Sequence, residues 1–280
     1  MTFTTRFAPS PTGPLHLGHA YSAILAHDMA RAANGAFLLR MEDTDLQRAK
    51  PEWDAAVVED LTWLGLRWDG LILRQSAHLR EYDRYLDRFD DMGLLYPCSC
   101  SRADIRAAVS APQEGVSHDL YPGTCKNRPM SYRQPGDALR LHLDRALARL
   151  GDQDVVFHET GQTHSGTHQL NPARALREIG DVVLSRKGEE IIAYFLASAL
   201  DDVHQKITHV VRGEDLFEFT QLQVLLLTLL ELPVPIYHHH RLIRDDEGKR
   251  LAKRDDARAI AKYRADGASP EDIRRMVELA

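Results

Sequence analysis

The sequence lacks long apolar stretches and has few cysteines. Its longest apolar run, residues 224–230, is too short to span a bilayer, and residues 1–5 lack the basic start and apolar core of a signal peptide. Three cysteines among 280 residues are too few, and odd in number, for a disulfide framework. These absences argue against a secreted disulfide-rich domain. We expect a cytoplasmic protein with no membrane segment.

The chain also lacks an excess of positive charge. It carries 35 Lys and Arg residues against 41 Asp and Glu residues, a net charge of −6. This balance disfavours a protein that coats nucleic acid without selectivity, but a local surface for one RNA stays compatible with it. The 44% of hydrophobic residues can build the core of one large domain or two smaller ones.

Neither a Walker loop nor a Gly-x-Gly-x-x-Gly fingerprint is present, yet residues 8–20 indicate a nucleotide site. We predict a strand over residues 3–7, a Pro- and Gly-rich turn, and a helix over residues 15–33. A helix that begins after such a turn offers N–H groups and a positive dipole end to phosphate. His16 and His19 share one side of the first turn and could bind phosphates. The alternative is a pair of surface histidines.

Two further positions follow predicted strands. A second strand over residues 36–41 completes a β-α-β unit, the start of a doubly wound parallel sheet, and Glu42 comes at its carboxyl end, where ligands bind in such sheets. Glu42 could instead belong to an acidic loop that caps the next helix. Arg212 follows a strand over residues 207–211. We expect it to be an exposed anion-binding side chain or an ion-pair partner.

Periodicity and turn residues place the remaining elements. The fold class is α/β. Helices are predicted over residues 51–65, 81–92, 194–200, 219–232 and 270–279, strands over 138–143 and 155–158, and a hairpin around residues 187–188. We divide the chain into a first catalytic half (1–95), an insertion (96–179), a second catalytic half (180–243) and a C-terminal segment with a basic loop and a short helical part (244–280).

All three cysteines lie in one loop-rich part of the insertion. Cys98, Cys100 and Cys125 are three soft ligands, and zinc takes four. The fourth could be Tyr121 or His118, and ligand chemistry alone favours the histidine. The alternative is three unlinked thiols. We therefore predict a structural zinc site.

Three sequence motifs resemble motifs of class I aminoacyl-tRNA synthetases, in the form carried by the glutamyl and glutaminyl enzymes. Residues 9–19, Pro-x-Pro-Thr-Gly-x-Leu-His-Leu-Gly-His, resemble the HIGH signature. Residues 40–45 are similar to a second motif of the glutamyl synthetases, Arg-x-Glu-Asp-Thr-Asp. Residues 250–254, Arg-Leu-Ala-Lys-Arg, resemble the KMSKS loop, which reads Lys-Leu-Ser-Lys-Arg in glutamyl enzymes. Here Ala252 replaces a serine that could bond a phosphate, so we expect slower activation.

The resemblance implies a Rossmann-like catalytic domain with an inserted zinc-containing α+β subdomain. It implies ATP as substrate, with Mg²⁺, and Zn²⁺ in the insertion. The implied catalytic residues are His16, His19 and Lys253, and ATP would also contact Gly18 and Arg250. The implied glutamate site consists of Arg6, Phe7, Ala8, Pro9, Ser10, Glu42, Tyr194 and Arg212. The resemblance favours Tyr121 as the fourth zinc ligand beside Cys98, Cys100 and Cys125.

Only about 26 residues follow the last motif, whereas a full glutamyl-tRNA synthetase continues into helical anticodon-binding domains. The resemblance therefore implies a shortened ligase, which activates L-glutamate with ATP and places it on the queuosine base in the anticodon of tRNA(Asp). We expect a monomer. Two alternatives stay open: a truncated glutamyl-tRNA synthetase that charges the tRNA 3′ end, and a non-catalytic, zinc-stabilised RNA-binding paralogue.

Overall fold

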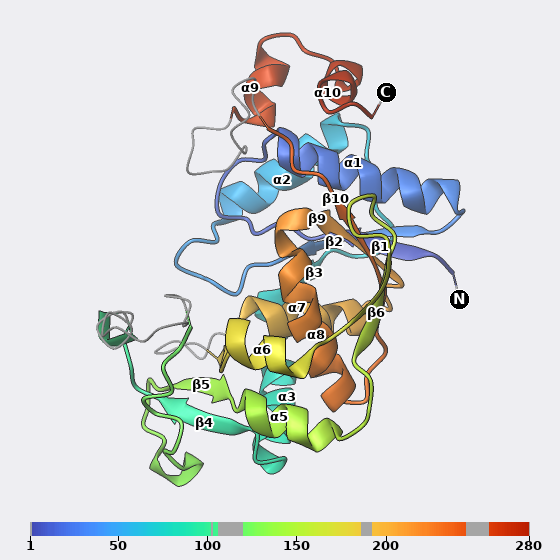
Figure 1. Cartoon of the computed structure of the whole chain (residues 1–280). Coiled ribbons are helices and arrows are strands. Elements are labelled where there is room, and N and C mark those ends of the chain that lie inside the picture. Colours follow the sequence, from blue (N-terminus) through green and yellow to red (C-terminus); the bar gives the residue numbers. More distant parts are fainter. Residues whose placement is uncertain (1, 102, 106–119, 186–191, 245–257, 280) are drawn as a thin grey trace.

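A computed structural model describes residues 2–101, 103–105, 120–185, 192–244 and 258–279 (Figure 1). The first half is the predicted β-α-β unit, formed by β1 (Thr4–Phe7), α1 (Leu17–Ala32) and β2 (Ala36–Met41). β1 and β2 are parallel, with Thr4 opposite Ala36. The short β3 (Leu73–Arg74) extends the sheet beyond β2, again in parallel. The strand and helix predicted on either side of the Pro-rich turn are confirmed.

The second half of the sheet joins the first at β1. It consists of β9 (His209–Gly213), β10 (Ile236–His240), β6 (Val156–Glu159) and β7 (Gly166–Gln169), and β7 is antiparallel to β6. β1 meets β9 through Thr208, whose N–H donates to the Thr4 carbonyl at 2.9 Å. The spatial order is thus β3-β2-β1-β9-β10-β6-β7. The point where the order reverses, between β1 and β9, is where sheets of this kind bind ligands.

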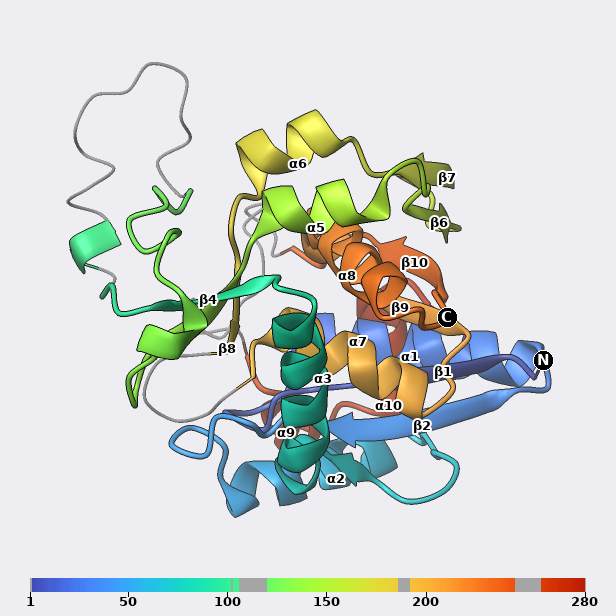
Figure 2. The same cartoon turned by 90° about the horizontal axis from the view of Figure 1, so that it is seen from below.

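Helices cover both faces of this sheet, as the predicted doubly wound architecture requires (Figures 1 and 2). One face packs against α1 and α2 (Pro51–Trp63), and α9 (Ile260–Ala265) and α10 (Pro270–Met276) lie on the outer side of these two helices (Figure 1). The other face packs against α3 (Leu79–Asp91), α7 (Tyr194–His204) and α8 (Phe217–Leu229). Each side has its own hydrophobic core. No described helix has the length and apolar character needed to cross a bilayer.

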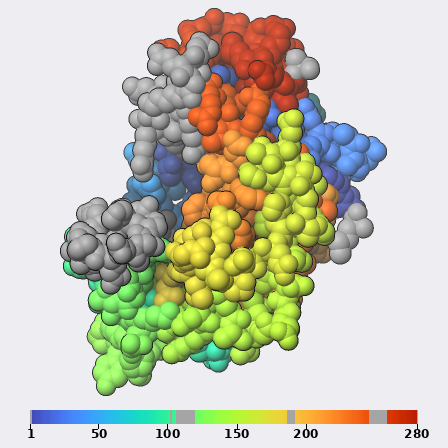
Figure 3. Space-filling view, viewed as in Figure 1, coloured from blue at the N-terminus to red at the C-terminus, as the bar shows by residue number. Residues whose placement is uncertain are grey.

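The middle of the chain builds a second, antiparallel sheet from β4 (Leu95–Cys98), β5 (Ala138–Leu141) and β8 (Val183–Ser185). It lies with α5 (Leu143–Leu150) and α6 (Pro172–Glu178) at the opposite end of the molecule from α9 and α10 (Figures 1 and 3). β6 and β7 lie between residues 96 and 179, yet they pair through β10 with the sheet that contains β1 and β9, which we call the main sheet. The division at residues 95, 179 and 243 stays a prediction. Residues 187–188 lie outside the described chain, although Ser185 and Ile192 form an antiparallel bridge beside them.

Candidate active site

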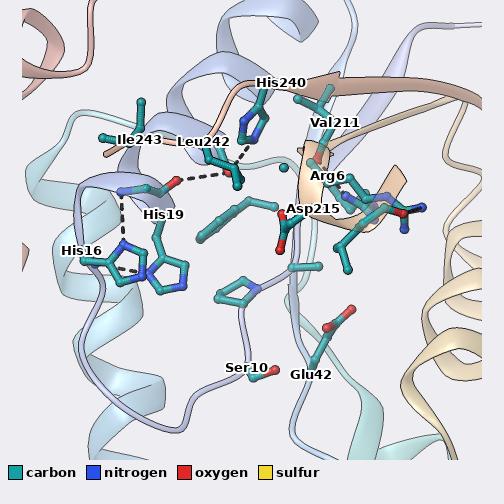
Figure 4. A pocket seen from close by; sticks show the side chains of 18 of the residues that line it. Arg6, Ser10, His16, His19, Glu42, Val211, Asp215, His240, Leu242 and Ile243 are labelled. Carbon is teal, nitrogen blue, oxygen red and sulfur yellow. Dashed lines mark hydrogen bonds between the residues drawn. The ribbon is translucent and has the colours of Figure 1, made fainter. Parts of the chain in front are cut away.

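A pocket of about 460 Å³ lies at the carboxyl ends of β1 and β9. Its volume suits a nucleotide or a small substrate. Every residue predicted to bind glutamate or ATP that the structure describes lines it: Arg6, Phe7, Ala8, Pro9, Ser10, His16, Gly18, His19, Glu42, Tyr194 and Arg212. Figure 4 shows the imidazoles of His16 and His19 on one side, across the pocket from Arg6 and Glu42.

The two histidines form the N-terminal cap of α1. The N–H of Gly18 donates to His16 Nδ1 at 3.1 Å, and the N–H of His16 donates to His19 Nδ1 at 3.2 Å. Because Nδ1 accepts in both rings, the neutral imidazoles carry their proton on Nε2 and donate through it. The ring centroids are 3.8 Å apart, and the first turn of α1 contains no acidic residue. The helix end is therefore suited to an anion.

A buried network of charges lies beneath the side of the pocket that contains Arg6 and Glu42. Arg6 Nε and Arg40 Nη1 each donate to Asp202 Oδ1 at 2.8 Å. Arg40 Nη2 donates to Glu42 Oε1 at 3.3 Å. Burial raises the pKa of Glu42 to about 7, although Arg40 and Arg6 oppose the shift. A substrate ammonium group beside this carboxylate would lower that pKa again.

Sequence reasoning missed two members of this network. The sequence motif contains Arg40 without indicating its role, and Asp202 lies in no motif, although both side chains are almost completely buried. A signal was present, because an arginine inside an apolar strand and an Asp-Asp pair inside an apolar helix are costly unless they meet partners. The pattern could not show that residues 162 positions apart are those partners.

Arg212 is buried, not exposed as expected, with 6% of its surface accessible. Its Nη1 donates to Gln223 Oε1 at 2.6 Å and its Nη2 to Thr220 Oγ1 at 2.8 Å. Its Nε donates to His239 Nε2 at 3.0 Å. The reason is that α8 packs over the end of β9 and supplies polar side chains to the guanidinium. Arg212 therefore contributes to the fold as well as to the pocket wall.

His240 and Ser22 are further pocket residues that the sequence did not reveal. Ser22 Oγ lies 2.7 Å from His240 Nε2, and His240 Nδ1 lies 2.8 Å from the Arg241 carbonyl oxygen. That carbonyl can only accept, so Nδ1 carries the proton and Nε2 accepts from the serine. Burial lowers the pKa of His240 to about 4, so the ring is neutral at physiological pH.

The basic loop lies outside the described residues, and so do Arg250, Ala252 and Lys253 within it. The described residues before this segment line the pocket, and those after it contact the start of α1 and the turn before it. Leu242 and Ile243 line it, and Ala259 forms an antiparallel bridge with His16. The N–H of Ile260 also donates to the Leu15 carbonyl at 2.9 Å.

The three cysteines converge at the end of β4. The Sγ atoms of Cys98, Cys100 and Cys125 all lie within 4.8 Å of one another. Tyr121 Oη is 3.4 Å from Cys98 Sγ and 3.6 Å from Cys100 Sγ, and Cys100 and Cys125 are separated by 3.5 Å. A zinc tetrahedron with 2.3 Å bonds has S···S edges of about 3.8 Å, so this donor set fits such an ion. His118 lies outside the described residues.

Comparisons with known proteins define the class. The chain matches tRNA synthetases class I (E and Q), catalytic domain, over residues 2–280. It is 57% identical to a Glutamyl-Q tRNA(Asp) synthetase of Rhodobacter capsulatus, over 98% of this chain and 99% of the relative. Glutamyl-Q tRNA(Asp) synthetase of Nocardia farcinica is 39% identical over 96% of this chain and 81% of the relative. The chain therefore belongs to the class I synthetase family, among the Glutamyl-Q tRNA(Asp) synthetases.

Solved structures agree on the fold. A glutamate tRNA ligase of Elizabethkingia meningosepticum, crystallised with its amino acid, superposes with a TM-score of 0.78 at 28% identity. The match covers 99% of this chain, which spans 60% of that structure. A methionyl-tRNA synthetase of Mycobacterium tuberculosis superposes with a TM-score of 0.61 at 12% identity over 99% of this chain and 64% of the other, which shows the fold alone.

Proposed function

We propose that this chain is a ligase that activates L-glutamate with ATP and transfers the glutamyl group to queuosine in tRNA(Asp). The observation that carries the proposal is the shared cavity. Phosphate-binding imidazoles at a helix end and buried arginines beside a carboxylate line one pocket at the switch point of the sheet. The names of the 57% and 39% identical relatives support the same substrate pair.

The first step is attack of the glutamate carboxylate on the α-phosphate of ATP, with departure of pyrophosphate. Mg²⁺, when bound to the triphosphate, would neutralise part of its charge. No protein nucleophile is needed, so the residues align the reactants and stabilise charge. His16 and His19 donate through Nε2 to the phosphates, and Gly18 permits close approach. Lys253 and Arg250 stabilise the negative charge of the departing pyrophosphate.

Glutamate is held on the opposite side of the pocket. Arg6 and Arg212 bind its carboxylates, Glu42 binds its ammonium group, and Tyr194 packs against its aliphatic stem. The backbone turn from Phe7 to Ser10 completes the wall. In the second step, a hydroxyl of the queuosine ring attacks the mixed anhydride and AMP leaves.

Zinc is proposed as a structural ion held by Cys98, Cys100, Cys125 and Tyr121. The convergence of three thiols and a phenol supports this ligand set. When bound, the ion would cross-link the end of β4 to the loop that contains Tyr121. With this ion bound, the insertion at residues 96–179 would be a zinc-containing α+β subdomain. The monomeric state and the cytoplasmic location stay predictions.

Labelled glutamate, supplied with queuosine-containing and queuosine-free tRNA(Asp) side by side, tests the proposal. We expect label only on the queuosine-containing tRNA. Equal labelling of both, or labelling of neither while ATP–pyrophosphate exchange proceeds, would refute the queuosine target.

One observation favours a second function. A Glutamate--tRNA ligase of Lawsonia intracellularis is 34% identical over 95% of this chain, which covers 54% of that relative. A truncated glutamyl-tRNA synthetase would label tRNA(Glu) at its 3′ end, and periodate oxidation of that end would abolish the labelling. A non-catalytic RNA-binding paralogue would show no glutamate-dependent exchange at all.

A further inference from the structure

Three neighbouring strands carry Glu159, His239 and Arg212 side by side across the main sheet. β6, β10 and β9 are adjacent (Figure 1). Their register places His239 opposite Arg212 and Tyr237 opposite Glu159. The side chains of Glu159 and His239 are completely buried. Burying an acid and a histidine is costly unless each is fully hydrogen-bonded, so this arrangement calls for a specific explanation.

The hydrogen bonds fix the tautomer of His239. Arg212 Nε can only donate, and it lies 3.0 Å from His239 Nε2, so that nitrogen accepts. The proton of the neutral ring is therefore on Nδ1, which donates to Glu159 Oε2. Glu159 Oε1 accepts the N–H groups of His239 at 2.9 Å and of Gly161 at 2.5 Å. Burial alone would raise the pKa of Glu159, but these hydrogen bonds lower it to about 2, so it is ionised.

Gly161 shows that the acid is held tightly. A Cβ at this position would collide with the His239 carbonyl oxygen and lie 2.7 Å from Glu159 Oε1. Only glycine allows the backbone of residue 161 to approach and cap the carboxylate. The loop after β6 is therefore shaped around the Glu159–His239 pair.

The pair also completes the set of fixed acceptors around Arg212. A guanidinium has five N–H groups. His239, Gln223 and Thr220 each accept one of them, from Nε, Nη1 and Nη2 respectively. The Leu216 carbonyl oxygen lies 3.5 Å from Nη2 and accepts its second N–H, so Nη1 keeps an N–H group for a ligand in the pocket that Arg212 lines. The plane of the fork is thus set before any substrate binds.

We propose that Glu159 and His239 are positioning residues that set the affinity of the pocket for glutamate by fixing the orientation of Arg212. This inference rests on the proposed role of Arg212 in glutamate binding. Glu159 selects the Nδ1–H tautomer of His239, and that tautomer presents an acceptor to Arg212 Nε. The opposite tautomer would present a second donor and displace the guanidinium.

Glu159→Gln tests the tautomer directly. The carbonyl oxygen of the new amide can keep the two backbone N–H groups, which leaves its NH₂ group facing His239 Nδ1. The imidazole proton then moves to Nε2, opposite Arg212 Nε. In glutamate-dependent ATP–pyrophosphate exchange we expect KM for glutamate to rise about 10-fold or more, the effect of one charged hydrogen bond. KM for ATP should change less than about twofold, because His16 and His19 are untouched.

Two further variants separate positioning from packing. His239→Gln can still offer its amide oxygen to Arg212 and its NH₂ group to Glu159, so its KM for glutamate should stay within about threefold of the original. Glu218→Gln is the matched control: it makes the same change on α8, where the Glu218 side chain is 64% exposed and pairs with Arg174, and it should alter neither KM.

Melting temperatures accompany every assay. If Glu159→Gln does not fold, the double variant Glu159→Gln/His239→Leu, which leaves no unpaired buried charge in the pair, is expected to fold and to show the same rise in KM. An unchanged KM for glutamate in Glu159→Gln, or in the double variant if only that one folds, would overturn the inference. Absence of glutamate-dependent exchange in the unaltered protein would instead refute the proposed function.

Discussion

The pKa of Glu42 leads to our most specific prediction about substrate binding in this pocket. Burial raises its pKa to about 7. It must be ionised to bind the ammonium group of glutamate, so kcat/KM for glutamate should depend on one proton. At pH 6 a group of this pKa is about one-tenth ionised, and kcat/KM should be about one-tenth of its value above pH 8.

The assay is ATP–pyrophosphate exchange between pH 5.5 and 8.5, with glutamate varied at saturating ATP. The control is kcat/KM for ATP at saturating glutamate, because bound ammonium lowers the pKa of Glu42 and removes its limb from that profile. Glu42→Gln should lower kcat/KM for glutamate by about 10- to 150-fold at pH 8, the cost of one ionic hydrogen bond. Its pH profile should lose the acidic limb. A flat profile in the original protein, or an unchanged limb in the variant, would refute the reasoning.

The raised pKa of Glu42 also predicts how the free energy of unfolding changes with pH. The pKa of Glu42 is raised from 4.5 to about 7, so between these values the folded chain holds a proton that the unfolded chain has released. Its contribution to stability is therefore complete below pH 4.5 and is lost as pH rises through about 7. The difference corresponds to about 3 kcal/mol at most. Glu42→Gln should thus melt no lower than the original protein at pH 8, and loss of activity cannot then be ascribed to unfolding.

Four other perturbations have clear expected outcomes. Asp202→Asn removes the charge that two buried arginines share and should lower the free energy of unfolding, measured with urea, by about 3–5 kcal/mol. Arg212→Ala should abolish glutamate-dependent exchange and also lower the melting temperature, because its buried partners lose their donor; unchanged exchange would misplace the glutamate site. Lys253→Ala should lower kcat of exchange by about 100-fold with little change in KM for glutamate. The unaltered protein should contain about one zinc ion per chain, measured by atomic absorption, and Tyr121→Phe should contain less. Absence of metal from the unaltered protein would refute the zinc site.

The sequence predicted local elements well because their causes are local. The strand, turn and helix around His16 follow from Pro, Gly and the apolar period. Likewise, α10 begins where the Ser269 hydroxyl and the Asp272 carboxylate form a capping box. His16, His19 and Glu42 were indicated for the same reason, since they follow a strand or begin a helix. Arg6 and Tyr194 were implied only by the family resemblance.

Long-range pairing was beyond local pattern. A strand at residues 155–158 was predicted, yet nothing nearby could show that β6 pairs with β10, about 80 residues later. The buried partners of Arg6 and Arg212 were missed in the same way. The expectation that Arg212 is exposed was wrong because the helix that covers it, α8, had no visible link to the pocket. Alternation along β10 explains the different contacts of its adjacent histidines: His239 contacts Glu159 and Arg212, whereas His240 contacts Ser22.

The buried partners explain how a small pocket can bind a small polar substrate. A mobile arginine side chain loses about 2 kcal/mol of rotamer freedom when it is fixed. Arg6 and Arg212 are already fixed by Asp202, His239 and Gln223, so folding, and not glutamate binding, carries that cost. Glu42 differs, because its raised pKa shows that the neighbouring arginines do not compensate its desolvation. In the proposed site, glutamate would supply carboxylates to arginine N–H groups that are already oriented, and an ammonium group to a carboxylate whose ionisation burial disfavours. One substrate would therefore balance the charges on both sides of the pocket.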